Sequence, residues 1–103
     1  MATYFVVRRV HGPAWDPSLP MRKQAGWPDH AAFMDALVAD GLVVLGGPLG
    51  EGDEVLLVME ASREEIIRTR LAADPWSEAG VLAISRIEPW TILLQRFRAP
   101  RNS

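Results

Sequence analysis

Hydrophobic residues along the chain follow two spacings, which predict alternating helices and strands. A helical spacing of three and four residues runs from about Pro28 to Asp40, and a continuous hydrophobic run, Leu42 to Gly47, follows it directly. Pro28 suits the first position of a helix, and Gly41 suits the residue that ends one. The predicted buried face of this helix carries His30, Phe33, Met34, Leu37 and Val38. The only polar member of that face is a histidine.

The other extended segments predict three more strands. Thr3 to Val10 and Glu54 to Glu60 hold nearly unbroken runs of β-branched, aromatic and aliphatic residues, so we expect strands that are covered on both faces. Leu82 to Leu94 is the last extended segment, and Pro89 within it removes one backbone donor from the strand. This segment is therefore expected at an edge of the sheet or at a bulge.

A second helix is predicted between the last two strands. Ser62 and Glu65 have the spacing of a capping box, in which each side chain bonds the backbone N–H of the other residue. Ile67 and Leu71 belong to the inner face of this helix. Pro75 ends it, because a proline disfavours the helical conformation of the residue before it.

The predicted order βαββαβ is the split βαβ arrangement of an α+β, ferredoxin-like domain. Right-handed crossovers place the first and third strands in the middle of an antiparallel sheet and the proline-bearing fourth strand at an edge. Two helices cover only one face of such a sheet. The first strand is apolar on both faces, so we expect the uncovered face to pack against the sheet of a second copy in a homodimer.

Composition and charge exclude several classes of protein. The 103 residues fit one domain, taken as residues 1–95, with a basic and flexible tail at 96–103. Apolar residues make up 49% of the chain and charged residues 23%, which is typical of globular proteins and argues against a membrane span. The net charge of −2 gives no basic face for nucleic acid. No secretory leader is recognised, so a cytoplasmic location is expected.

The segment from His11 to Trp27 is an unusually long connection for so small a domain. It contains three prolines, two glycines and two tryptophans, which break regular structure but still supply large apolar groups. Such loops are typical of lids, binding loops and contacts to a partner. Trp15 and Trp27 therefore have two interpretations: they fix the loop or cover a neighbouring subunit, or they form the wall of a pocket.

Two motifs resemble a known family. They are H-x-x-F-x-x-x-L-x-x-x-G-L-V-V-L-G-G-P from His30 to Pro48 and D-P-W-x-x-A-G-V from Asp74 to Val81. Because of these two motifs, the chain resembles the YCII-related domains. The resemblance covers the chain from its first strand to about Trp90. The resemblance implies a ferredoxin-like protomer, a dimeric α/β barrel and a cleft that holds His30 and Asp74 as a catalytic pair. Many members carry an arginine three residues before this histidine, where this chain has Trp27, and the nearest arginine is Arg22.

Each of the two candidate catalytic residues also has a purely structural interpretation. A histidine on an apolar helix face is often a hydrogen-bonded core residue, and Asp74 suits the cap of a short turn that begins at Pro75. If the two side chains meet, the carboxylate orients the imidazole and favours its charged form. A histidine held in this way can act as a general acid or base near neutral pH.

The functional hypothesis is therefore an enzyme that moves protons on a small organic molecule without metal or cofactor, as a lyase, isomerase or hydrolase. The expected substrate-binding residues are Arg22, Trp27, Phe33 and Trp76. A zinc site is not expected, because His11 is the only other histidine and zinc normally takes three or four protein ligands. The alternative is a non-catalytic module of the same fold that binds a small molecule or a protein, and a cofactor-free oxygenase is a third possibility.

Overall fold

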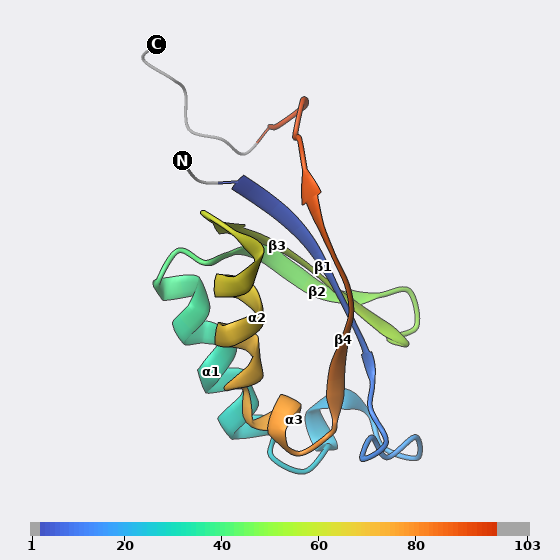
Figure 1. Ribbon diagram of the computed structural model, residues 1–103. Coiled ribbons are helices and arrows are strands. Elements are labelled where there is room, and N and C mark those ends of the chain that lie inside the picture. Colours follow the sequence, from blue (N-terminus) through green and yellow to red (C-terminus); the bar gives the residue numbers. More distant parts are fainter. Residues whose placement is uncertain (1–2, 97–103) are drawn as a thin grey trace.

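The computed structural model describes residues 3–96 as a four-stranded antiparallel sheet with helices on one face (Figure 1). The predicted tail at 96–103 lies outside the described residues from position 97 onward. The α+β, ferredoxin-like order is confirmed, with a short third helix and a 3₁₀ helix in addition. The elements are β1 (Thr3–His11), η1 (Met21–Lys23), α1 (Trp27–Ala39), β2 (Val43–Leu49), β3 (Glu54–Ala61), α2 (Glu64–Ala72), α3 (Pro75–Glu78) and β4 (Leu82–Trp90).

The strands lie in the order β2-β3-β1-β4, which confirms the prediction that β1 and β3 are central and β4 is at an edge. The predicted end of β4 at Leu94 is wrong. The strand ends at Trp90, which pairs with Tyr4 near the beginning of β1, and within residues 3–96 β1 is the only strand beside it. Leu93 and Leu94 pair with no strand of this part of the chain and are 86% and 93% exposed.

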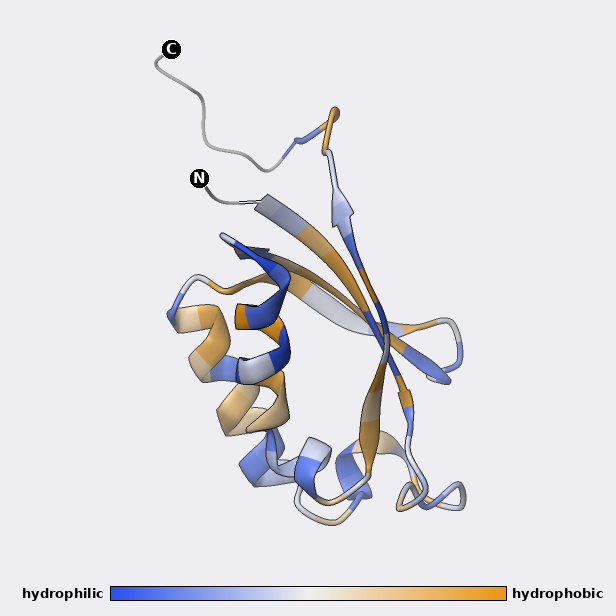
Figure 2. Ribbon diagram, in the orientation of Figure 1, coloured by the Kyte–Doolittle hydropathy of each residue, from blue (hydrophilic) through white to orange (hydrophobic). Residues whose placement is uncertain are grey.

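Alternate residues of the sheet face the helices and form the core. On β1 these are Phe5, Val7 and Arg9, which are buried, and their partners on β3 are Met59, Leu57 and Val55. Leu37 from α1 and Ile67 and Leu71 from α2 pack against this face. Hydrophobic residues accordingly run along the strands and along α1 (Figure 2).

No described helix covers the opposite face of the sheet (Figure 1). We call it the open face. The apolar side chains that the strand register places there are Tyr4, Val6, Val10, Leu56, Val58 and Trp90. Charged residues share this face, including Arg8 and Glu54, which form an ion pair at 3.1 Å.

Helices α1 and α2 both differ from the predictions in detail. Helix α1 begins at Trp27, after Gly26 in a left-handed conformation, and Val38 is 54% exposed although its spacing placed it on the buried face. The predicted capping box of α2 is wrong. The N-cap is Arg63 and it has no side-chain cap bond, so Glu65 stands at the second helical position, one short of the position that the box requires.

The long segment between β1 and α1 is folded on itself by the hydrogen bonds of one buried side chain. Its most buried side chain is Gln24, which is 4% exposed. The Gln24 amide donates to the Asp16 and Leu19 carbonyl oxygens and accepts from the Asp16 backbone N–H.

No helix within residues 3–96 is long and apolar enough to cross a membrane.

Candidate active site

Asp74 lies in the turn between α2 and α3, and its side chain is completely buried. Its backbone is extended, as is usual before a proline, and Pro75 begins α3. One carboxylate oxygen accepts a hydrogen bond from the Trp76 backbone N–H at 2.9 Å, so the expected capping role is confirmed. This bond uses one acceptor position of the carboxylate, so both oxygens can still accept hydrogen bonds from other partners.

The first of these partners is His30, in the first turn of α1. Its Nδ1 atom lies 2.9 Å from Oδ2 and 3.0 Å from Oδ1 of Asp74. The side chain of His30 is 10% exposed and that of Asp74 is 0% exposed. The structure thus brings the two residues of the separate sequence motifs into direct contact inside the protein.

The second partner is Arg9 on β1, which the sequence analysis missed. Its Nη1 donates to Asp74 Oδ2 at 2.8 Å, and its Nη2 donates to Ser77 Oγ at 2.7 Å. Ser77 Oγ in turn donates to the Leu71 carbonyl oxygen at 2.7 Å. The Arg9 side chain is 1% exposed. Sheet, α1 and α3 therefore each contribute a side chain to one buried polar cluster.

The sequence does carry a signal for Arg9. It follows Phe5 and Val7 at a spacing of two, so an inward-facing strand position must hold it. A buried arginine needs an anionic partner, and Asp74 meets that need. The nearly continuous apolar run of the first strand predicted cover on both faces, which left its arginines without a predicted role.

The surroundings of Asp74 favour its ionised form. Burial by itself raises the pKa of the Asp74 carboxyl group, but hydrogen bonds from His30, the Trp76 N–H and Arg9 outweigh burial, so the pKa lies below its ordinary value of 3.8. An ionised carboxylate can only accept hydrogen bonds. His30 Nδ1 must therefore carry the hydrogen that points to Asp74.

The other ring nitrogen of His30, Nε2, has no hydrogen-bond partner within residues 3–96. Within the same residues, Arg9 Nε is the one buried side-chain nitrogen or oxygen atom that lacks a hydrogen-bond partner. Nε2 therefore keeps contact with solvent. One nitrogen of the imidazole is fixed by Asp74, and the other is neither hydrogen-bonded within residues 3–96 nor fully buried.

Aromatic rings hold the plane of the imidazole. Trp76 stacks on His30 with ring centroids 4.0 Å apart and an angle of 8° between the planes. The indole Nε1 of Trp76 donates to the Ala25 carbonyl oxygen at 2.8 Å, which fixes the indole in turn. Trp27 approaches His30 from one helical turn earlier, with ring centroids 5.7 Å apart. Phe33 packs against the main hydrophobic core instead.

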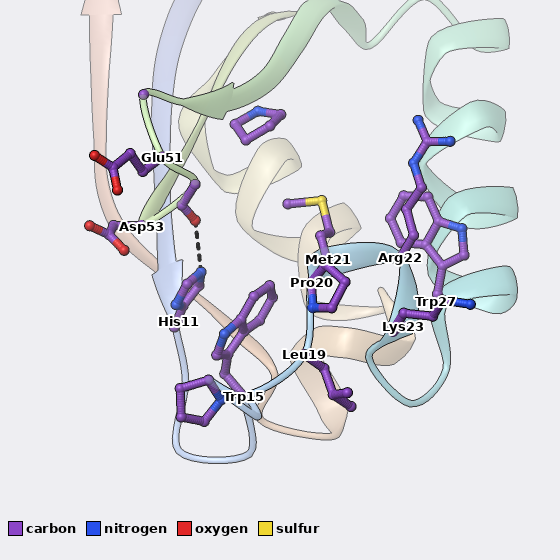
Figure 3. Close-up of a pocket in the computed structure, with 14 residues that line it drawn as sticks. His11, Trp15, Leu19, Pro20, Met21, Arg22, Lys23, Trp27, Glu51 and Asp53 are labelled. Atoms are coloured by element: carbon purple, nitrogen blue, oxygen red, sulfur yellow. Dashed lines mark hydrogen bonds between the residues drawn. The ribbon is translucent and has the colours of Figure 1, made fainter.

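A cleft of about 810 Å³ lies beside the Trp27 ring (Figure 3). Its walls come from the segment after β1, from η1 and from the turn between β2 and β3, and they include Trp15 and Trp27. Arg22 also lines it, with its guanidinium carbon 5.7 Å from the centre of the Trp27 ring. The carboxylates of Glu51 and Asp53 point away from the middle of the cleft (Figure 3). Its interior is therefore aromatic with cationic groups at one side.

The predicted site residues divide between the cleft and the buried cluster. Trp27 and Arg22 line the cleft. Trp27 joins the two regions, because its ring also lies beside that of His30. The lining does not include the other four predicted residues, which are His30, Phe33, Asp74 and Trp76.

The two histidines lie in different surroundings. His11 stacks on Trp15 with ring centroids 3.7 Å apart, and its Nε2 lies 2.8 Å from the Gly52 carbonyl oxygen, whereas His30 binds Asp74. Across residues 3–96, no three histidine, cysteine, aspartate or glutamate side chains are grouped as metal ligands.

Comparisons with known proteins agree with the fold. Among solved structures, the chain is similar to the 5-chloro-2-hydroxyhydroquinone dehydrochlorinase (TftG) of Burkholderia phenoliruptrix in complex with 2,5-dihydroxybenzoquinone. The identity is 28%, the TM-score is 0.65, and the match covers 85% of this chain and 93% of the dehydrochlorinase. A search of curated proteins finds no match. The YCII-related domain matches residues 4–91, and the chain therefore belongs to the YCII-related family.

Proposed function

We propose that the protein is an enzyme that moves protons on a small organic molecule, with His30 as the general base and Asp74 as the residue that orients it. The observation that carries this proposal is the contact of 2.9 Å between His30 Nδ1 and the buried Asp74 carboxylate, which leaves Nε2 open to a substrate. General bases are recognised by this combination of a fixed orientation and an accessible nitrogen.

In the proposed reaction, His30 Nε2 takes a proton from an acidic O–H or C–H group of the substrate. The imidazolium that forms is stabilised by the Asp74 carboxylate, which stays ionised. Elimination, isomerisation and hydrolysis all begin with such a step. The similar dehydrochlorinase supports elimination, in which the proton and the leaving anion depart from the same molecule.

The cleft supports a hydroxylated aromatic or quinone-like substrate. Trp15 and Trp27 offer flat apolar surfaces to such a ring, and Arg22 offers a cation to an ionised phenol oxygen. The dehydrochlorinase carries a dihydroxybenzoquinone, a molecule of this class. Because Trp27 lies between the cleft and His30, we expect its side chain to contact the bound ring.

The test is turnover of a chlorinated hydroxyhydroquinone without oxygen, followed by ultraviolet absorbance and chloride release. The unchlorinated hydroxyhydroquinone has no leaving anion and should not be converted. His30→Gln should lower the turnover number by about 10²- to 10⁴-fold, the usual contribution of a general base. Asp29→Asn is the control, since Asp29 is the exposed neighbour of His30 on α1 and lies outside both the cleft lining and the buried cluster. Equal turnover by wild type and His30→Gln would refute the assignment of the base.

A second candidate is a non-catalytic binding module, favoured by the fact that the residues lining the cleft do not include His30. In this case a quinone quenches the fluorescence of the cleft tryptophans, but no substrate of the class is converted. The cofactor-free oxygenase is distinguished by oxygen consumption in the same assay under air.

We also propose that two copies pack through their open faces, because the apolar residues there have no covering helix. Sedimentation should give a dimer, and Val6→Glu, at the middle of the open face, should give a monomer. Val38→Glu is the control, because Val38 is 54% exposed on α1, which lies on the helix-covered side of the sheet and not on the open face (Figure 1). A wild-type monomer at micromolar concentration would contradict the proposal.

A further inference from the structure

The buried cluster contains one carboxylate but two groups that can be positive. Arg9 is always protonated, whereas His30 can be charged or neutral near pH 7. With Asp74 ionised, Arg9 alone makes the cluster neutral. A charged His30 would leave one uncompensated positive charge among groups that are 10% exposed or less.

We propose that Arg9 is a positioning residue that keeps His30 in its neutral form, with the hydrogen on Nδ1 and the lone pair on Nε2. This inference rests on the proposed function, because only a neutral imidazole can serve as the general base. Arg9 acts through Asp74: it supplies the positive charge that the carboxylate would otherwise take from a protonated histidine.

The geometry fixes Arg9 for this role. Its two terminal nitrogens donate to different acceptors: Nη1 to Asp74 Oδ2 at 2.8 Å and Nη2 to Ser77 Oγ at 2.7 Å. Asp74 can therefore face His30 with both oxygens, at 2.9 and 3.0 Å, while Arg9 approaches from the sheet side. Nε of Arg9 is buried without a partner within residues 3–96, which is unfavourable for stability and suits a residue kept for its charge.

Other charged groups near His30 do not form ion pairs with the cluster. Arg22, from η1, lies over Trp27. Asp29, the neighbour of His30 on α1, and Glu78 on α3 are both exposed. Solvent screens these charges, so Arg9 and Asp74 set the protonation of His30.

The first experiment uses the wild-type protein labelled with ¹⁵N on histidine. Nuclear magnetic resonance distinguishes the two neutral tautomers and the imidazolium by their ring nitrogen shifts. At about pH 7.5, above the ordinary titration range of histidine, we expect His30 to be neutral with its hydrogen on Nδ1. A doubly protonated His30 at this pH, or a hydrogen on Nε2, would overturn the proposal. This measurement needs no variant and no substrate.

The second experiment follows the titration midpoint of His30 in Arg9→Gln, which removes the charge but keeps hydrogen-bond donors. The midpoint should rise by about one to three pH units, the effect of a carboxylate that has lost its other cation. Ser77→Ala is the matched control, since it removes one bond of Arg9 and leaves the charge, and its midpoint should equal that of wild type. An unchanged midpoint in Arg9→Gln, or the same rise in Ser77→Ala, would refute the role of the Arg9 charge.

Failure of the proposed function gives a different result. If the protein only binds its ligand, the titration shifts remain as described and no substrate is converted. If it is an enzyme, Arg9→Gln should also move the acidic limb of the pH profile of kcat/KM upward by the same number of pH units. A profile that falls in height but does not move would mean that Arg9 has only a structural role.

Discussion

Arg8 and Arg9 are adjacent on β1 and have the same side chain, but they lie on opposite faces of the sheet. Arg8 is on the open face, where it forms an ion pair with Glu54 at 3.1 Å and both side chains are more than 40% exposed. Arg9 faces the helices and pairs with Asp74 at 2.8 Å, with exposures of 1% and 0%. The alternation of strand side chains thus decides whether an arginine is a surface charge or part of a candidate active site.

The largest expected difference between the two arginines is in the free energy of unfolding. Arg9→Met leaves the buried Asp74 carboxylate without its permanent cation, which should destabilise the protein by about 3–5 kcal/mol. With both variants made in the monomeric Val6→Glu background, where the open face is in solvent, Arg8→Met removes an exposed ion pair, which contributes about 0–1 kcal/mol. Urea unfolding followed by tryptophan fluorescence measures both values. Equal losses for the two variants would mean that the Arg9 pair is not isolated from water.

A pair of tryptophans tests the same comparison of faces. Trp76 is 1% exposed and donates to the Ala25 carbonyl oxygen, whereas Trp90 is 44% exposed on the open face. Trp76→Phe leaves that acceptor without its donor, so we expect a loss of about 1–3 kcal/mol, together with a displaced His30 resonance. In the monomeric Val6→Glu background, where the open face is in solvent, Trp90→Phe keeps an aromatic ring at the surface and should change the stability by less than about 0.5 kcal/mol. Similar losses in thermal unfolding would contradict the comparison.

The fold could be predicted from the sequence because each element carries its own local pattern. The helical spacing of 28–40 and the unbroken runs of the central strands predict the order of the elements. Right-handed crossovers then predict the strand order, and Pro89 in the last strand agrees with a place at the edge. The errors lie at element ends. Leu93 and Leu94 look like a continued strand, but the sequence alone does not show that the neighbouring strand has already ended.

The site was predictable only in part, because contacts between distant residues leave no periodic signal. His30 and Asp74 were identified through the resemblance of two motifs, since either one alone has an adequate structural explanation. Arg9 could have been found from its inward register. Ser77 could not, because its role depends on how α3 turns its hydroxyl group toward the Arg9 guanidinium.

Acid should separate the two ion pairs. Because the folded-state pKa of Asp74 is lowered, its contribution to stability is present above the unfolded value of about 3.9 and is lost as the pH falls through the lower, folded value. The loss is about 1.4 kcal/mol for each unit of difference between the two. Asp74→Asn should flatten the stability curve below about pH 4, and Glu54→Gln should leave it as in wild type. Chemical unfolding at several acidic pH values tests this, and parallel curves for wild type and Asp74→Asn would contradict it.

The smallest expected effect concerns two serines, one beside each arginine. Ser77 Oγ accepts from Arg9 and donates to the Leu71 carbonyl oxygen at 2.7 Å, whereas Ser85 Oγ makes a long, exposed bond of 3.3 Å to the Arg8 carbonyl oxygen. Ser77→Ala should lower the free energy of unfolding by about 0.5–1.5 kcal/mol, the usual net value of a hydrogen bond. Ser85→Ala should have no measurable effect, because water replaces its bond. If Ser77→Ala were also neutral in urea unfolding, Asp74 alone would hold Arg9 in place, and the difference between the two faces would depend on that single ion pair.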